Sequence, residues 1–439
     1  MSRRSMPPGR WPRTSNISIA KRRWARARGV FPPRRPPATR SSLRCSTSCR
    51  ATCRAASSFR SMRTVSTRTL RTMSRGWLPR KRCAGPERSV VAKTRQQAGS
   101  KREASGNTQE RSMSNTSAAL DVITYGEAMA MFVAAETGAL AGVGQFTKRV
   151  AGADLNVAIG LSRLGFKVGW MSRVGNDSFG QYVRDTLTKE GIDQRCVTTD
   201  ERYPTGFQLK SKNDDGSDPA VEYFRKGSAA SHLSLADYAA DYVLSARHLH
   251  LTGVAPAISA SSCELAFHLA REMRAAGKTI SFDPNLRPTL WPSRAAMVER
   301  LNALAALADW VLPGIGEGEI LTGYTQAEDI AKFYLDQGAR GVIIKLGAEG
   351  AYFRTADDAA VIAGQPVAKV VDTVGAGDGF AVGVVSALLE GKALPQAVAR
   401  GNRIGALAIQ VIGDSEGLPS RAELDALELA DAPSVASAA

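Results

Sequence analysis

The chain has 439 residues, enough for two or three average domains or for one large domain with an additional segment. Residues 1–112 contain 29 Lys and Arg against three acidic residues, whereas residues 113–439 contain 29 against 38, so the net charge of +17 combines two unlike pieces. The basic balance therefore does not indicate nucleic-acid binding by the part that folds. No run of about 18 apolar residues occurs, and we expect no membrane-spanning helix.

The first 112 residues are rich in Arg, Ser, Pro and Thr and show no sustained apolar periodicity. Such a segment buries too little apolar surface to offset its chain entropy, and we expect it to be disordered. It also has the composition of an organellar transit peptide or of a nucleic-acid-binding arm. We favour a fourth interpretation, a start assigned too far upstream, because Met113 is followed by a short polar lead and then by a strand-like run.

Cysteine and histidine are unevenly distributed. Four of the six cysteines lie in residues 1–112 without a C-x-x-C spacing, and all four histidines lie beyond that segment, so a zinc site is not expected there. Only Cys196 and Cys263 remain in the folded part. This usage suits a reducing compartment, and we expect the protein to be cytoplasmic.

From residue 121 onward, short β-rich runs alternate with longer helical ones. Strands separated by helices of ten or more residues indicate right-handed crossovers and a parallel sheet covered on both faces, which is a three-layer α/β domain over residues 113–439. The expected strands are 121–126, 168–175, 247–253, 279–283, 309–313 and 341–347, and the expected helices are 154–165, 178–191, 259–276, 293–308 and 325–337.

Two segments interrupt this alternation. Residues 127–150 separate the first strand from the first helix, and residues 203–230 contain two strand-like runs around the turn signal DDGSD. Neither segment fits a crossover, so we place both in a small sheet that projects from the main one. Ligands of open α/β sheets sit beyond the carboxyl ends of the strands, and this small sheet is therefore a candidate lid.

The stretch DTVGAGDGF, residues 372–380, precedes the apolar run 381–389. A Gly-Ala-Gly turn that leads into a helix lets backbone N–H groups point into a small cavity, where the helix dipole adds partial positive charge. Such a cavity suits an anion. Asp378, in the first helical turn, could be only an N-cap. Beside an anion site it could equally be the base that phosphoryl transfer to a hydroxyl requires.

Other glycine-rich motifs are excluded. The dinucleotide-binding fingerprint would require Gly where Phe380 stands, and the P-loop would require Gly-Lys-Ser/Thr. The signatures of protein kinases are missing as well.

The run DTVGAGDGFAVGVVSAL resembles the C-terminal signature of the ribokinase-like (PfkB) carbohydrate kinases, and AGADLNVAIGLSRLG at 151–165 resembles their N-terminal signature. The resemblance covers residues 120–415. It implies a three-layer αβα ribokinase-like fold with a small β-sheet lid, and an ATP- and magnesium-dependent transfer of the γ-phosphoryl group to a sugar hydroxyl. In that family the Asp matching Asp378 is the catalytic base, and the amides of Gly375, Ala376 and Gly377 form the anion hole.

Two further runs bear on the acceptor. EYFRKGSAAS at 222–231 and DPNLRPTLW at 283–291 together resemble 2-keto-3-deoxygluconate kinases, with fructokinases as close relatives. The keto-deoxy acid carries a carboxylate, and we expect the guanidinium forks of Arg225 and Arg287 to converge on it, with surface ion pairing as the alternative. Tyr223 should then face the sugar, with Phe224 packed behind it.

The resemblance also assigns other contacts with the acceptor sugar. Gly152 and Asn156 match family positions that approach sugar hydroxyls, although Asn156 could be an ordinary buried amide. Gln208 stands where relatives often carry Tyr in the first lid strand, and this difference is expected to alter one contact with the sugar.

The nucleotide side rests on the run VIIKLGAEGAY at 342–352, which alone predicts only a hairpin. The family uses it beside ATP, which makes Lys345, Gly347 and Gly350 candidate nucleotide contacts. Asn285 and Asn402 are carried over for the same role.

A magnesium contact is expected at Glu317. The usual Asn-x-x-Glu of the family occurs here with Gly314 in place of Asn. Because Mg²⁺ keeps several of its waters, we expect Glu317 to act on it through water. A solvated Glu at a helix N-terminus is the alternative.

These observations lead to three hypotheses. The first is a kinase that converts 2-keto-3-deoxygluconate to its 6-phosphate, with Asp378 as general base. The second is a fructokinase or another sugar kinase of the same fold. The third is a regulatory protein that binds a sugar or nucleic acid without turnover. For the folded domain we expect no nucleic-acid or membrane partner, and a homo-oligomer formed through the lid.

Overall fold

The computed structural model describes residues 119–214 and 217–430, and the predictions made for residues 1–112 lie outside them. Among the described residues, nine strands form the central sheet in the spatial order β13-β12-β11-β10-β9-β8-β1-β4-β5. Neighbours from β5 to β11 pair in parallel, and β12 and β13 add an antiparallel edge, so the predicted parallel sheet is confirmed. The strands are β1 (Val122–Tyr125), β4 (Val168–Gly175), β5 (Asp193–Asp200), β8 (His248–Thr252), β9 (Thr279–Asp283), β10 (Trp310–Val311), β11 (Gly341–Lys345), β12 (Gly350–Thr355) and β13 (Ala359–Ala363).

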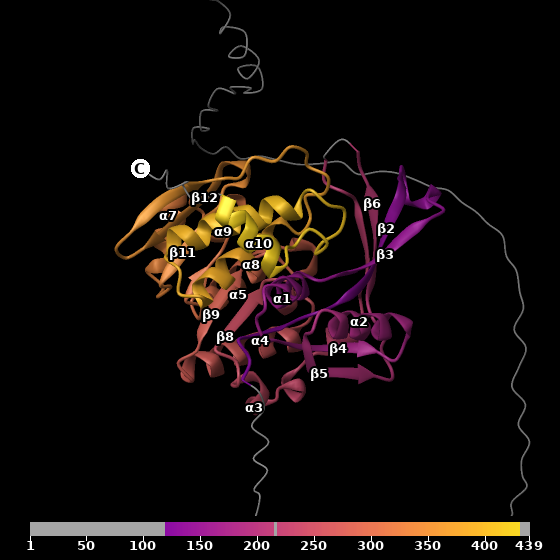
Figure 1. Cartoon of the computed structure of the whole chain (residues 1–439). Coiled ribbons are helices and arrows are strands. Elements are labelled where there is room, and N and C mark those ends of the chain that lie inside the picture. Colours follow the sequence, from indigo (N-terminus) through magenta and orange to yellow (C-terminus); the bar gives the residue numbers. More distant parts are fainter. Residues whose placement is uncertain (1–118, 215–216, 431–439) are drawn as a thin grey trace, which may run out of the picture. The chain divides into compact units, whose positions relative to one another are not determined.

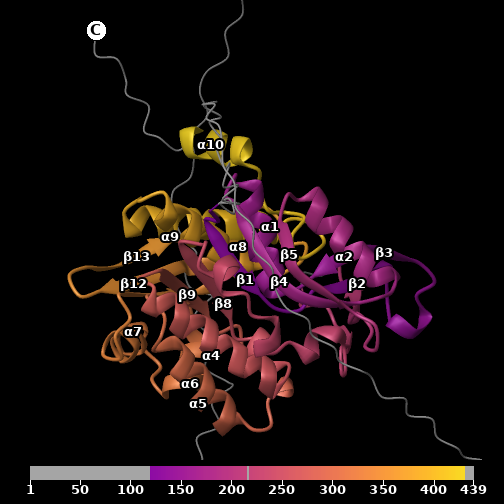
Figure 2. The same ribbon diagram turned by 90° about the horizontal axis from the view of Figure 1, so that it is seen from below.

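Helices cover both faces of the sheet, as Figure 2 shows. One layer consists of α1 (Ala153–Arg163), α2 (Ser178–Lys189), α8 (Ala376–Leu389) and α9 (Leu394–Ala408), and α10 (Arg421–Ala430) packs onto it. The other layer consists of α3 (Ala240–Val243), α4 (Ala260–Ala275), α5 (Arg294–Ala305), α6 (Ile315–Thr322) and α7 (Ala327–Leu335). The predicted three-layer architecture is therefore confirmed. Within the residues that the structure describes, no helix combines the length and apolarity needed to cross a bilayer.

The sequence forms these elements for simple reasons. All residues of β1 and β8 are buried, because helices cover both faces of a parallel sheet and leave no solvent side for polar alternation. On α4, the buried residues Leu265, Leu269 and Met273 recur every four positions and face the sheet. The hydroxyl of Ser259 caps that helix by accepting from the amide of Ser262 at 3.1 Å.

The two segments that interrupt the alternation form a separate four-stranded sheet, the lid sheet (Figure 1). Its strands, in spatial order, are β3 (Phe146–Ala151), β2 (Met129–Thr137), β6 (Phe207–Lys212) and β7 (Val221–Phe224). β6 and β7 pair antiparallel around the predicted turn, of which residues 215 and 216 lie outside the described residues. The ring of Phe224 stacks on Phe207 at 4.6 Å between centroids.

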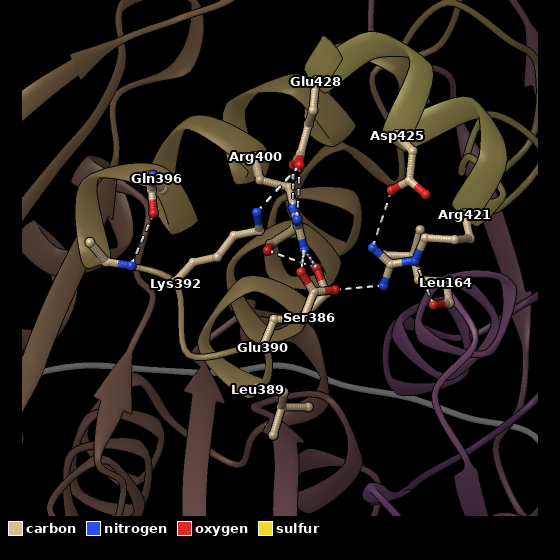
Figure 3. Close-up of polar contacts among 12 residues, drawn as sticks. Leu164, Ser386, Leu389, Glu390, Lys392, Gln396, Arg400, Arg421, Asp425 and Glu428 are labelled. Carbon is tan, nitrogen blue, oxygen red and sulfur yellow. Dashed lines mark hydrogen bonds and ion pairs between the residues drawn. The ribbon is translucent and has the colours of Figure 1, made fainter. Parts of the chain in front are cut away.

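A buried charge cluster holds the C-terminal helices together (Figure 3). The side chain of Arg400 on α9 is 1% exposed and lies between Glu390, which follows α8, and Glu428 on α10, at 2.8 and 2.7 Å. Arg421 on α10 pairs with the second oxygen of Glu390 at 2.5 Å and donates to the carbonyl of Leu164. These contacts fix α10 against the helical layer that contains α8.

Candidate active site

The Gly-Ala-Gly turn lies where helix α8 begins. Gly375 is the residue before the first helical one and has φ of 89°, a left-handed conformation that favours glycine. A Cβ atom there would also clash with the carbonyl oxygen of Asp414. The first amides of a helix have no partner within it, so those of Ala376, Gly377 and Asp378 remain free to bind an anion.

The carboxylate of Asp378 does not cap the helix. Asp378 is the third residue of α8, and its two oxygens accept from the side-chain amides of Asn156 at 2.7 Å and Asn285 at 3.2 Å. Burial raises the pKa of Asp378 to about 7, and the negative charges of Asp283 and Asp414 act in the same direction against the Asn156 hydrogen bond. A carboxylate with a pKa in this range is suited to take a proton at neutral pH.

A cavity of about 530 Å³, the first cavity, opens in front of this carboxylate. It lies beyond the carboxyl ends of the parallel strands and is closed on one side by the lid sheet, as expected for an open α/β sheet. Of the predicted site residues, it brings together Gly152, Asn156, Gln208, Tyr223, Arg225, Asn285, Arg287, Glu317, Lys345, Gly375, Gly377 and Asp378.

A second cavity, of about 640 Å³ and mostly apolar, lies on the other side of the glycine turn. It shares Lys345, Thr373 and Gly377 with the first cavity, so the two meet at the start of α8. The remaining predicted residues Ala376, Gly347, Gly350 and Asn402 line it.

Two residues predicted to contact the nucleotide have other partners in the structure. Asn285 lines the first cavity rather than the second, and it donates to Asp378 from a strained backbone with φ of 37°. The amide of Asn402 lines the second cavity but donates to the carbonyls of Ile362 and Ala363, each at 3.0 Å. Asn402 therefore holds strand β13 in place.

The two arginines expected to converge lie in different surroundings. Arg225 is held by Glu127, whose Oε2 accepts from its Nε at 2.6 Å, while Ser228 donates to Oε1 of the same carboxylate at 2.5 Å. Arg287 donates only to the carbonyl of Leu286, and no described carboxylate pairs with it. Both arginines line the first cavity, but only Arg287 has a guanidinium without an ion-pair partner among the described residues.

Sequence reasoning missed Glu127. One glycine separates Glu127 from the end of the first strand, so it lies at the carboxyl edge of the sheet. That position is the signal from which a place in the site could have been predicted. Its side chain is only 2% exposed, so it fixes Arg225 inside the cavity wall rather than at the surface.

Three further acidic residues shape the electrostatics of the first cavity. Asp283, at the end of β9, pairs with Lys345 at 2.7 Å, and this contact outweighs burial and raises the pKa of Lys345. Burial also raises the pKa of Asp154 to about 7, against hydrogen bonds from the amide and hydroxyl of Thr252. Asp414 lines the same cavity. None of these three residues was predicted as part of the site.

Glu317 acts in the structure as a helix-capping residue. Its Oε2 accepts from the amide of Gly314, where α6 begins, and its Oε1 accepts from the amide of Leu286, at 2.7 and 2.8 Å. The carboxylate still lines the first cavity and lies 4.0 Å from the ammonium of Lys345. Among the described residues, no three His, Cys, Asp or Glu side chains cluster closely enough to hold a metal without other ligands.

Comparison with known proteins agrees with this geometry. Residues 119–421 match the family described as pfkB family carbohydrate kinase. The chain belongs to this family. The match spans the lid sheet, both cavities and the DTVGAGDGF turn, so the protein is a carbohydrate kinase with the fold expected from its two signatures.

Among curated proteins, the chain is 55% identical over 306 residues to the 2-dehydro-3-deoxygluconokinase of Bacillus subtilis (strain 168), covering 70% of this chain and 94% of that protein. It is 32% identical over 284 residues to a fructokinase of Escherichia coli, covering 62% and 90%.

Solved structures show the same relationship. The crystal structure of a PfkB protein from Polaromonas sp. JS666 is 55% identical, with a TM-score of 0.66, and covers 70% of this chain and 100% of that chain. An Escherichia coli protein named as a ribokinase II, in complex with ATP and Mg²⁺, is 26% identical, with a TM-score of 0.66, and covers 71% and 99%. A member of the family thus binds ATP and Mg²⁺.

Proposed function

We propose that this protein transfers the γ-phosphoryl group of ATP to the terminal hydroxyl of 2-keto-3-deoxygluconate and forms the 6-phosphate. The observation that carries the proposal is the buried carboxylate of Asp378, placed beside the free amides of a helix N-terminus at the meeting point of two cavities. The 55% identity to a 2-dehydro-3-deoxygluconokinase supports the choice of acceptor.

The first cavity would hold the sugar acid. Asn156 and Asn285 orient the carboxylate of Asp378. Gly152 lines the same cavity, and a side chain there would clash with the backbone of Glu127. Arg287, which lacks an ion-pair partner among the described residues, is the better placed arginine for the carboxylate of the acid. Arg225, already paired with Glu127, would shape the wall and hold the lid strand.

The second cavity would hold the nucleoside part of ATP. Its apolar walls around Phe380 and Ile409 suit a purine ring, and the glycines of the β11–β12 turn allow close approach of the chain. From there the phosphates would run toward Gly377, where the two cavities meet.

In the transfer step, Asp378 would accept the hydroxyl proton while the hydroxyl oxygen forms its bond to the γ-phosphorus. The bond from that phosphorus to the β,γ-bridging oxygen breaks, and ADP leaves. The amides of Ala376, Gly377 and Asp378 would stabilise the charge on the transferred group, because they are fixed before the reaction and need no reorganisation. The ammonium of Lys345 adds positive charge at the same junction.

Magnesium fits this site as a partner of the phosphates. Mg²⁺ is usually held by one or two carboxylates together with substrate phosphates, and it supplies neutralisation of phosphate charge. Glu317 is the residue we assign to it, through water, since both its oxygens already accept backbone hydrogen bonds.

Three expectations remain predictions. They are the closing movement of the lid sheet, a homo-oligomer formed through that sheet, and a cytoplasmic location.

A fructokinase is the second candidate, supported by 32% identity to such an enzyme. Release of ADP by the full-length chain with Mg-ATP would be measured in parallel with 2-keto-3-deoxygluconate, fructose, ribose and adenosine. The proposal requires kcat/KM for the keto-deoxy acid to exceed that for fructose by at least about a hundredfold, the discrimination expected when a site must satisfy a charged group. A preference for fructose would move the assignment to the second candidate.

A further inference from the structure

Lys210, on lid strand β6, has its ammonium group in the protein interior. Its side chain is 1% exposed and contacts two carboxylates, Asp372 Oδ2 at 2.6 Å and Asp414 Oδ1 at 2.8 Å. The residue lines neither of the two cavities. Lys210 therefore cannot touch either substrate, and any part it has in the reaction must pass through these two acids.

Both acids hold the backbone that forms the anion hole. Asp372 begins the DTVGAGDGF turn, and its two oxygens accept from the amides of Val374 and Gly413, each at 3.1 Å. The carbonyl of Asp414 packs directly against the Cα of Gly375, leaving no room for a side chain. The segment before α8 and the segment at 413–414 are thus in contact with each other. Each of them contributes one carboxylate to the ammonium of Lys210.

The charge at this place has a clear electrostatic role. Two buried carboxylates that share one small space repel each other, and the repulsion is strong away from water. Burial alone would lower the pKa of Lys210, but Asp414 and Asp372 outweigh it and raise that pKa, so the amine is a permanent cation at neutral pH. Without it, the two segments would carry uncompensated negative charge at their point of contact.

The same lysine joins the anion hole to the sugar-binding wall. Gln208, two residues earlier on β6, lines the first cavity, and residues two apart on a strand share a face. The β6–β7 ribbon makes a second contact with the turn, because the hydroxyl of Thr373 donates to Asp218 at 2.5 Å. The lid sheet and the start of α8 are therefore linked at two points.

We propose that Lys210 is a positioning residue for phosphoryl transfer, whose ammonium holds the Asp372 and Asp414 segments together so that the amides of residues 376–378 face the transferred group. This inference rests on the proposed kinase function. It assigns Lys210 no contact with sugar or nucleotide. The proposal also means that strand β6, which lines the sugar cavity, helps to hold the anion hole in its conformation.

The test compares Lys210→Met with the wild-type full-length chain. Met keeps the length and apolar stem of the side chain but removes its charge. We expect kcat to fall by about a hundredfold, the loss typical of a catalytic group displaced by about an ångström. The KM values for ATP and for the acceptor should change by less than about threefold, because uniform binding is not affected. Lys332→Met, which removes an exposed pair with Asp336 on α7, is the matched control and should behave as wild type.

Chemical rescue separates positioning from a general loss of stability. Ammonium ions should restore part of the kcat of Lys210→Ala in a saturable manner, while tetramethylammonium, which is too large for the space between the carboxylates, should not. Absence of rescue, or a kcat for a folded Lys210→Met within about threefold of wild type, would overturn the proposal.

Loss of a buried ion pair can also prevent folding. If Lys210→Met does not fold, Lys210→Arg decides the question, since it keeps the charge but not the spacing. A folded Lys210→Arg with lower kcat and unchanged KM values supports the proposal, and an unchanged kcat contradicts it. Absence of turnover by the wild type with every acceptor would instead refute the kinase function. If the wild type phosphorylates fructose instead, the Lys210 variants are compared with the wild type using fructose as the acceptor.

Discussion

Asn156 on α1 donates its side-chain amide to the carboxylate of Asp378 on α8 at 2.7 Å, although 222 residues separate them in the chain. This hydrogen bond connects a residue of the N-terminal signature with a residue of the C-terminal signature. It orients the oxygen of Asp378 toward the first cavity, and it stabilises the charged form of a buried acid. The side-chain oxygen of Asn156 is buried and has no partner among the described residues.

The pH dependence of the reaction should reflect Asp378. Its pKa is raised to about 7, so the base is protonated and inactive at lower pH. We expect kcat/KM to rise with pH and to level off above about 7, with a tenfold fall per unit on the acid side. Asp154 titrates near the same pH and interacts with Asp378, so the measured value belongs to the pair. A profile that stays flat from pH 5 to 8 would exclude Asp378 as the base.

Asn156→Ser tests the hydrogen bond between Asn156 and Asp378. Loss of the amide removes a donor to the charged carboxylate, and the pKa of Asp378 should rise further. We expect the acid limb of kcat/KM to move up by about one pH unit, the value of a hydrogen bond to a charged group. The pH profile of the purified variant measures the shift. An unmoved limb would show that Asn156 only contacts the sugar.

Substitutions of the two arginines should have different effects. Arg287 should matter for binding of the keto-deoxy acid, and Arg225 should matter for the stability of the lid. Arg287→Met should raise KM for the keto-deoxy acid by about tenfold or more while leaving KM for ATP unchanged, because a charge-assisted contact is lost. Arg225→Met leaves Glu127 buried without its partner, and we expect a lower thermal midpoint together with weaker sugar binding. Steady-state kinetics and thermal unfolding of both variants provide the comparison. Equal effects of both changes on KM alone would contradict the different roles.

Arg400 is expected to contribute to stability and not to catalysis. Arg400→Met would remove a buried arginine and its contacts with Glu390 and Glu428 (Figure 3), which keep Arg421 and Lys392 as partners. The free energy of unfolding should therefore fall by about 1.5–3 kcal/mol, the range for hydrogen bonds to charged groups. Arg340→Met, which removes a pair on an arginine that is 67% exposed, should cost less than about 1 kcal/mol. Urea unfolding measures both values. If Arg400→Met lowers the free energy of unfolding no more than the control does, the contacts of Arg400 do not fix α10 to the layer that contains α8.

Much of this fold was predictable because the signals are local. Buried parallel strands give uninterrupted apolar runs, and glycines mark turns that no other residue can form, as at Gly375. The lid strands were recognisable for the same reason, since alternating runs enclose a turn signal. Short or weakly patterned elements escaped prediction, among them β13 and α10.

The electrostatics of the site were harder to predict. Glu127, Lys210 and Asp414 carry no motif, and each looks like an ordinary charged residue in sequence. Lys210 and Asp414 are 204 residues apart and meet only because the fold brings strand β6 next to the segment at 413–414. Likewise, Glu127 lies between β1 and β2 and Arg225 follows β7, so this pair joins residues that are 98 positions apart. Such contacts follow from topology, and composition and spacing do not contain them.

In the proposed mechanism, Asp378 removes the proton from the hydroxyl that attacks ATP. The most direct measurement is ADP formation by the full-length wild type and by Asp378→Asn with saturating Mg-ATP and 2-keto-3-deoxygluconate. We expect turnover by the wild type and a fall in kcat of about 10²–10⁴-fold in the variant, with ATP binding retained. A folded Asp378→Asn enzyme with a kcat close to wild type would contradict it.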